Sequence, residues 1–349
     1  MEVFGQLPDG RDVERHRLEN ANGVAVDLLT LGGIIQRFEA PDRDGRIADI
    51  ALGYADLAAY LDNPSHLGCI IGRCANRIAG AEVEIDGRAY ALPRNRGQDT
   101  LHGGGEGFHR ALWRVVEAGA TRLHLRHTSP EGDQGLPGVL TVEAIYSLGD
   151  DNGLRLDFEA TSSAATIFNP TQHAYWNLAG DGVGDVLDHR LTVHAEAFTP
   201  MSERMVPTGE IRAVAGGPLD FRVAARLGDR VDRVDDPQIK LAGGVDHNFV
   251  LAMAPTPALR LAALIEDPAS GRRLEVSTTE PGLQVYTANF LGGARPGKSG
   301  RPYGKRQGVA LETQHFPDAP HHPAFPSILL RPGEAFRSST VFRVGVTGR

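Results

Sequence analysis

Hydrophobic and polar residues alternate in short runs through most of the chain, and turn residues separate the runs. The clearest run is 154–161, in which Leu, Leu, Phe and Ala occupy every second position. This period of two is typical of a β-strand with one buried face. A similar run at 139–148 precedes it, and the connecting residues 150–153, Asp-Asp-Asn-Gly, favour a turn. The pattern predicts a β-hairpin.

The same signals recur along the chain. We expect further strands at 24–31, 34–38, 82–85, 88–92, 259–266, 273–278 and 335–346. Asp86-Gly87 is the strongest tight-hairpin signal. Helical periodicity is scarce, and only 57–61 and 223–227 favour short helices. The pattern predicts an all-β fold, a large antiparallel β-sandwich with a few short helices. Since no repeat or linker interrupts it, we expect a single domain over 1–349.

Composition narrows the classes of partner. The chain has 349 residues, of which 41% are hydrophobic, and a net charge of -8, which argues against nucleic acid or an anionic membrane surface. No apolar run approaches the ~18 residues of a membrane span, and the first residues lack the apolar core of a secretory signal. Cys69 and Cys74 suit a reducing compartment. We expect a cytoplasmic protein, monomeric or homodimeric, without a nucleic-acid or membrane partner.

The segment 169–180, NPTQHAYWNLAG, places a histidine among small, amide and aromatic residues. Its Asn-Pro start favours an extended or turn conformation. Alternation would direct His173 and Tyr175 to one face, and Gln172, Ala174 and Trp176 to the other. An imidazole can donate and accept protons near neutral pH. A partly buried structural histidine is the alternative interpretation.

Other polar residues stand in rigid, turn-rich surroundings. Asn76 and Arg77 adjoin each other, and a guanidinium offers several donors to an oxygen-rich ligand. His102 precedes consecutive glycines, which would let a ligand approach the backbone. Asp246 begins a short polar patch, and Glu312 follows an apolar run that would end a strand. Each of them, taken alone, also fits an ordinary loop, turn or strand edge.

Two patterns suggest chemistry that we do not expect. The spacing of His315, His321 and His322 matches none of the standard zinc patterns, so no metal is predicted. Residues 292–299, GGARPGKS, satisfy the phosphate-loop pattern GxxxxGK[ST]. That loop requires a helix beginning at the Lys-Ser pair, whereas Gly and Pro residues follow Ser299 here. We therefore predict a loop without nucleotide, and no cofactor.

Taken together, six blocks resemble the aldose 1-epimerase family, the galactose mutarotases. In chain order they are NRIAG, LHGGGEGFHR, NPTQHAYWNLAG, VDHNF, PGLQVYTANF and LETQHFPDAPHHPAFPS. The resemblance extends from about Leu31 to Phe342, and the family's fold is a large antiparallel β-sandwich. Gln172, Ala174 and Trp176 depart from the residues usual in the family, which are Asn, a hydroxyl residue and Phe.

The resemblance implies an enzyme that interconverts the α and β anomers of aldohexoses such as D-galactose and D-glucose. Glu312 would be the base at the C1 hydroxyl, and a protonated His173, aided by a nearby ionised carboxylate, the acid at the ring oxygen. His102 would assist near the ring oxygen. The residues expected to hold the other sugar hydroxyls are Asn76, Arg77, Tyr175, Asp246 and Gln284.

Three alternatives remain open at this point. A relative acting on a different hexose, or on a hexose 6-phosphate with Arg73 and Arg110 as candidate phosphate ligands, would use the same chemistry. A glycosidase would need two carboxylates, such as Asp246 and Glu312, but would leave His173 without a role. A non-catalytic sugar-binding protein would not need the pair of Glu312 and His173.

Overall fold

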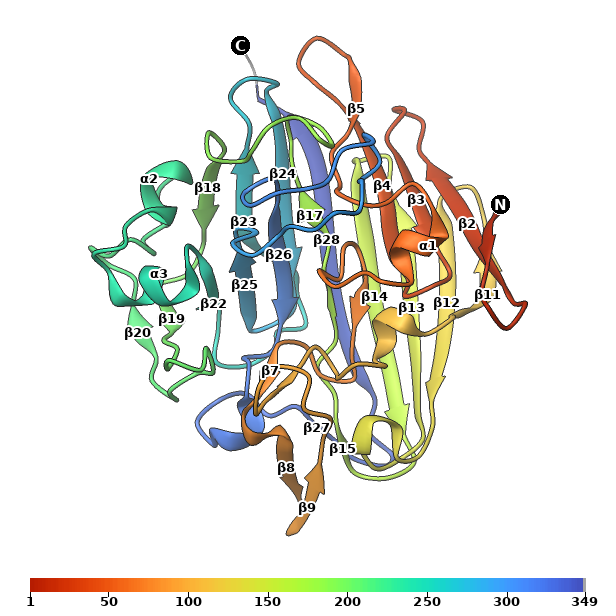
Figure 1. Ribbon diagram of the computed structural model, residues 1–349, viewed down its shortest axis with the longest axis vertical. Coiled ribbons are helices and arrows are strands. Elements are labelled where there is room, and N and C mark those ends of the chain that lie inside the picture. Colours follow the sequence, from red (N-terminus) through yellow and green to blue (C-terminus); the bar gives the residue numbers. More distant parts are fainter. Residues whose placement is uncertain (348–349) are drawn as a thin grey trace.

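Antiparallel strands make up nearly all of the regular structure in the computed structural model, which describes residues 1–347. Three larger sheets of five, nine and six strands are accompanied by two-stranded pairs (Figure 1). The all-β prediction is confirmed. None of the helices formed by the described residues has the length and hydrophobicity required to span a membrane.

The sheets combine strands that lie far apart in the sequence. The five-stranded sheet contains, in spatial order, β1 (Glu2–Gln6), β2 (Asp12–Glu19), β3 (Ala25–Leu29), β4 (Ile34–Pro41) and β5 (Ile47–Asp49). The nine-stranded sheet contains β11 (Arg114–Ala118), β12 (Arg122–Ser129), β13 (Leu140–Leu148), β14 (Gly153–Ser162), β28 (Phe336–Val346), β24 (Arg272–Thr278), β23 (Arg260–Glu266), β18 (Arg190–Val193) and β21 (Ala225–Arg226). The six-stranded sheet contains β17 (Tyr175–Trp176), β26 (Val309–Gln314), β25 (Gly282–Tyr286), β22 (Asp246–Val250), β19 (Ala197–Thr199) and β20 (Arg212–Ala213).

Short elements complete the fold. The two-stranded pairs are β16 (Thr171–Gln172) with β6 (Ile70–Ile71), β10 (Thr100–Leu101) with β7 (Arg77–Ile78), β8 (Glu82–Ile85) with β9 (Arg88–Ala91), and β15 (Thr166–Ile167) with β27 (Leu329–Leu330). The helices are α1 (Leu57–Tyr60), α2 (Gly228–Val231) and α3 (Pro237–Ala242), and the 3-10 turns are η1 (Ala79–Ala81), η2 (Phe108–Arg110), η3 (Asp133–Gly135) and η4 (Ala319–His321).

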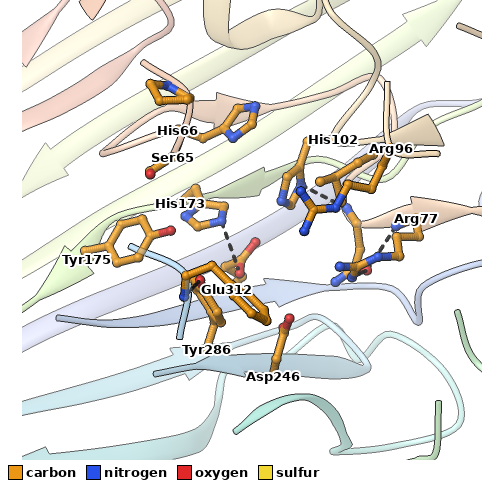
Figure 2. A pocket seen from close by; sticks show the side chains of 14 residues that line it. Ser65, His66, Arg77, Arg96, His102, His173, Tyr175, Asp246, Tyr286 and Glu312 are labelled. Carbon is orange, nitrogen blue, oxygen red and sulfur yellow. Dashed lines mark hydrogen bonds and ion pairs between the residues drawn. The ribbon is translucent and has the colours of Figure 1, made fainter. Parts of the chain in front are cut away.

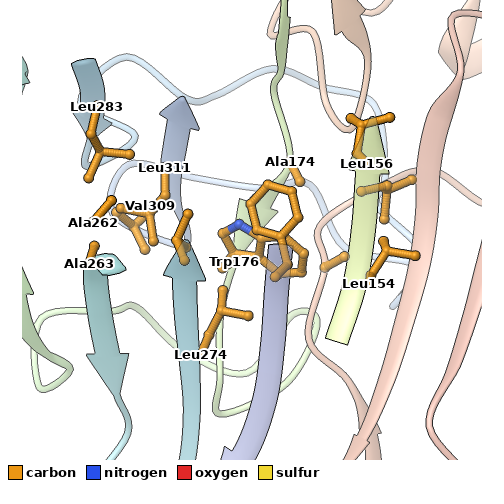
Figure 3. Close-up of a cluster of buried hydrophobic side chains, with 14 of the residues drawn as sticks. Leu154, Leu156, Ala174, Trp176, Ala262, Ala263, Leu274, Leu283, Val309 and Leu311 are labelled. Atoms are coloured by element: carbon orange, nitrogen blue, oxygen red, sulfur yellow. The ribbon is translucent and has the colours of Figure 1, made fainter. Parts of the chain in front are cut away.

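The main hydrophobic core lies between the nine-stranded sheet and the other two, and Trp176 lies within it (Figure 3). Its indole is fully buried and contacts Phe38 and Phe342, with ring centroids 5.5 and 5.3 Å apart. Ala174 belongs to the same core, whereas His173 and Tyr175 line a pocket. The predicted division of this segment into two faces is therefore confirmed, because alternate side chains of an extended chain point in opposite directions.

Most of the predicted elements are present within a residue or two. Asp86 and Gly87 have φ values of 52° and 77°, as a tight hairpin turn requires, and β13 pairs with β14 as expected. The helix predicted at 57–61 corresponds to α1. The helix predicted at 223–227 is wrong. Ala225 pairs with Leu191 in the edge strand β21, and the helix α2 begins only at Gly228.

The phosphate-loop pattern at 292–299 serves a structural purpose. Lys298 turns inward, where its ammonium lies 2.6 Å from Asp49 and donates to the backbone oxygens of Gln36 and Ala51 at 2.6 and 2.8 Å. Within residues 1–347, the segment after Ser299 forms turns and no helix begins there. The backbone amides therefore lack the helical alignment with which a phosphate loop binds its anion.

We expect Lys298→Met to lower the free energy of unfolding by ~1–3 kcal/mol, because Asp49 and two carbonyl oxygens lose their buried donor. Urea denaturation measures this change, and Lys305→Met, at an exposed position of the same region, is the matched control. Calorimetric titration with ATP should give no binding heat. An ATP signal that disappears in Lys298→Met would contradict the structural role.

Candidate active site

The six-stranded sheet supplies the floor of the site because its central strands have one apolar and one polar face. On β26, Val309 and Leu311 point into the main core, while Glu312 lines a pocket on the other side. Glu312 lies opposite Gln284 of β25, and Asp246 of β22 lies opposite Tyr286. Strand pairing thus brings together polar residues that are up to 66 positions apart in the chain (312 against 246).

Loops from the first third of the chain close the pocket from the opposite side (Figure 2). Its lining residues come from both parts: Pro64, Ser65, His66, Asn76, Arg77, Arg96, Leu101, His102, His173, Tyr175, Asp246, Tyr286, Phe290 and Glu312. Seven of the eight residues predicted from the sequence are among them (Asn76, Arg77, His102, His173, Tyr175, Asp246 and Glu312).

Glu312 and His173 face each other at the centre of this pocket. The Oε1 atom of Glu312 lies 3.5 Å from Nε2 of His173, and the two side chains are 2% and 4% exposed. The backbone N–H of His173 donates to Cys69 O at 2.8 Å, and its carbonyl accepts from Gly68 N at 3.0 Å. These two bonds fix the backbone position from which the imidazole projects. A carboxyl and an imidazole held this close can exchange protons with two neighbouring atoms of one bound ligand.

His102 presents a donor to the pocket. Its Nδ1 accepts the backbone N–H of Asn76 at 3.2 Å, so a neutral ring carries its proton on Nε2. The ring centroid lies 5.1 Å from that of His173. The glycines that follow have a different role from the predicted one. At Gly103, with φ of 77°, a Cβ would collide with the carbonyl oxygen of Gly72, so close packing of two backbones requires glycine there.

The remaining predicted residues form two groups. Asn76 Oδ1 accepts from the backbone N–H of Arg77 at 3.0 Å and from its guanidinium at 3.3 Å, which directs that cation along the pocket wall. Asp246 accepts from Gln284 Nε2 at 2.6 Å. Gln284 is buried and is not among the lining residues, so it orients Asp246 from behind.

Burial controls the protonation of the central pair. It raises the pKa of Glu312 well above the ordinary value of 4.5, with Asp246 adding to the effect and Arg77 opposing it. Burial, with a smaller contribution from His66, lowers the pKa of His173 to about 3. Both directions oppose the expectation of a protonated His173 beside an ionised carboxylate. Both shifts favour the neutral forms, a protonated Glu312 and an unprotonated His173, because burial withdraws the two groups from water.

The same geometry bears on metal binding. Among the described residues, His102, His173 and Glu312 offer ligand atoms that all lie within 4.8 Å of one another. A metal-bound imidazole normally donates its other N–H to an acceptor, whereas Nδ1 of His102 accepts a backbone N–H. The donor set therefore does not fit a metal ion. His315 and His321 are likewise engaged elsewhere, with Glu280 at 2.7 Å and Asp318 at 2.6 Å.

The candidate phosphate ligands Arg73 and Arg110 do not line the pocket. Arg73 is buried and donates to backbone oxygens of Ser129, Pro130, Pro137 and Gly138. Arg110 is exposed and donates to Leu61 O at 3.1 Å. The prediction that they could bind a phosphate in this site is wrong, since the guanidinium of Arg73 donates hydrogen bonds to backbone oxygens inside the fold and that of Arg110 faces solvent.

Sequence reasoning missed several residues of the wall, among them His66, Arg96, Tyr286 and Phe290. Tyr286 was within reach, because it stands two positions after Gln284 on one strand and so shares its face. The other three come from loops, where no periodicity indicates which side chains turn inward.

The sequence profile of the family described as aldose 1-epimerase matches residues 14–343. The chain belongs to the aldose 1-epimerase family. Galactose mutarotase from Rattus norvegicus is 41% identical over 345 residues, which cover 99% of this chain and 98% of that protein. Aldose 1-epimerase from Escherichia coli (strain K12) is 36% identical over 338 residues, or 96% of each chain.

Solved structures agree with this assignment. A GalM/aldose epimerase homologue from C. elegans superimposes with a TM-score of 0.89 at 28% identity, covering 96% of this chain and 100% of that one. Galactose 1-epimerase from Lactobacillus acidophilus gives a TM-score of 0.85 at 29% identity, covering 99% and 98%. The resemblance drawn from the sequence blocks is confirmed, and this member of the aldose 1-epimerase family is an isomerase acting on the anomers of aldoses.

The electrostatics predict a pH dependence with opposite shifts in two variants. An acid–base pair needs one proton, so kcat/KM, whose pH dependence reports the free enzyme, should fall at alkaline pH as the raised pKa of Glu312 is passed. Asp246→Asn removes a charge that raises this pKa and should move the alkaline limb to lower pH. Arg77→Gln removes a charge that lowers it and should move the limb to higher pH.

Polarimetry across the pH range, corrected for the uncatalysed reaction at each pH, measures the alkaline limb of the pH profile in each variant. The position of the limb is compared and not the height of the plateau, because both residues line the pocket and their loss also lowers kcat/KM by weakening sugar binding. If the alkaline limb moves in the same direction in both variants, or moves in neither, Glu312 is not the group that titrates.

Proposed function

We propose that this aldose 1-epimerase interconverts the anomers of aldohexoses such as D-galactose and D-glucose, with Glu312 and His173 as its acid–base pair. The observation that carries the proposal is the 3.5 Å approach of these two groups, whose side chains are almost completely buried at the base of the pocket. The names of the relatives from rat and L. acidophilus, which specify galactose, support the choice of sugar.

Anomer exchange requires opening of a hemiacetal, rotation about the C1–C2 bond and closure on the other face. Opening removes the proton of the C1 hydroxyl and adds a proton to the ring oxygen. Glu312 as carboxylate takes the first proton, and His173 as imidazolium gives the second, so neither a free alkoxide nor an oxocarbenium ion accumulates. Each group contributes a factor of ~10²–10⁴ to the rate.

After opening, Glu312 carries the proton and His173 is neutral, which are also the forms that burial favours. Closure on the opposite face reverses both transfers and restores the starting state. The pair thus needs no exchange of protons with solvent during turnover. Before a cyclic sugar reacts, one proton must pass from Glu312 to His173 across their 3.5 Å separation.

The surrounding groups have binding roles in this proposal. His102 donates from Nε2 near the ring oxygen, following the hydrogen bond that fixes its tautomer. Asn76, Arg77, Tyr175 and Asp246 hold the other hydroxyls, and Gln284 keeps Asp246 in position. A sugar-binding protein without catalysis would not need a carboxyl and an imidazole paired in its binding pocket.

We expect Glu312→Gln and His173→Asn each to fold and to reduce mutarotation at least ~100-fold, because each removes one proton-transfer group. The measurement is polarimetry on freshly dissolved α-D-galactose and α-D-glucose, with circular dichroism to verify folding. Galactose 6-phosphate in the same assay tests the phosphorylated alternative.

The chain offers a matched control. Glu280 and His315 form a second buried carboxylate–imidazole pair, 2.7 Å apart, and neither residue lines the pocket. The double variant Glu280→Gln/His315→Asn should retain near-normal activity per folded molecule. Near-normal rates in Glu312→Gln or His173→Asn would remove that residue from its role, and an inactive wild-type protein would overturn the proposed function.

A further inference from the structure

One wall of the pocket contains an imidazole to which the proposed reaction gives no task. His66 lines the pocket, and its ring centroid lies 5.0 Å from that of His102, 4.6 Å from that of His109 and 6.2 Å from that of His173. It thus stands beside both histidines of the site while coming from a separate loop, the one after α1.

This loop holds His66 in a fixed orientation. The residue has φ of 54°, in the left-handed region that non-glycine residues rarely adopt. Its backbone N–H donates to Asn63 O at 3.1 Å, and its carbonyl accepts from Cys69 N at 3.1 Å. The Asn63 side chain braces the loop by accepting from Leu67 N at 2.9 Å. The backbone that carries the ring is therefore fixed before a ligand enters, and the ring itself packs against those of His102 and His109, which reduces the entropy cost of a contact to it.

The ring nitrogens of His66 are free to bind a ligand. Among residues 1–347, neither nitrogen forms a hydrogen bond or an ion pair with the protein. Burial, reinforced by Arg110, lowers the pKa of His66 to about 4, so the ring is neutral at neutral pH. A neutral imidazole has one donor and one acceptor, and a hydroxyl group, which also has both, is its natural partner.

The position of His66 indicates which hydroxyl of the sugar its ring would contact. Figure 2 shows His66 and Glu312 on opposite sides of His173. If Glu312 serves the C1 hydroxyl and His173 the ring oxygen, as in the proposed function on which this inference rests, the next group beyond the ring oxygen is C5 with its hydroxymethyl substituent. We propose that His66 determines specificity by hydrogen-bonding the C6 hydroxyl of the aldohexose.

The test compares D-galactose with 6-deoxy-D-galactose, which lacks only that hydroxyl. The wild-type protein should favour galactose by about 3- to 10-fold in kcat/KM, the contribution of one hydrogen bond between neutral groups. In His66→Phe the ratio should fall to about 1, because a phenyl ring of similar shape cannot form the bond. His66→Gln, which keeps a donor and an acceptor, should retain a preference for galactose.

The ratio isolates the contact from a general structural effect, since both sugars report on the same fraction of folded enzyme. His109→Phe is the matched control, because His109 packs on His66 outside the pocket lining and its loss should leave the ratio unchanged. An equal rate for both sugars in the wild type, or an unchanged ratio in His66→Phe, would overturn the role of His66 while leaving the proposed function intact. A wild type inactive on both would overturn the proposed function and this inference with it.

Discussion

The structure depends on keeping a carboxyl group and an imidazole together in a place that water barely reaches. The Glu312 and His173 side chains are 2% and 4% exposed. Burial of ionisable groups without compensation is costly, and each charged form would lose its hydration shell. The pair is tolerated because burial favours the neutral forms, a protonated Glu312 and an unprotonated His173, which carry no net charge.

Rigid backbone on two sides maintains this arrangement. Glu312 belongs to β26, whose other face packs Val309 and Leu311 into the main core, so any movement of the carboxyl would disturb that packing. His173 sits between two short strands and is tied by its backbone to Cys69 and Gly68. The fully buried Trp176 anchors the same segment three residues further on. Because side chains alternate between the two faces of a strand, the same strands pack the core on one side and present the site residues on the other.

This periodicity also explains what the sequence could and could not predict. It located β13, β14 and β28 and the two faces of the 169–180 segment, because there the core itself imposes the alternation. It failed at 223–227, where a short apolar pattern is consistent with helix and strand alike and pairing with β18 decides the outcome. Family blocks identified seven lining residues, whereas His66 lies in a loop that no period describes.

The protonation of the pair follows from the tertiary structure and not from residue types. An isolated histidine would be the readier proton carrier near neutral pH, so residue types alone predict that His173 holds the proton. Folding reverses this order, because desolvation acts on Glu312 and His173 in opposite directions. The consequence for catalysis is favourable. In the proposed mechanism the neutral pair is the state that accompanies the open-chain sugar, and the ionised state needed for ring opening differs from it by one proton moved over 3.5 Å. In that mechanism, sugar hydroxyls that donate hydrogen bonds to the carboxylate favour its ionised form and so make the transfer easier.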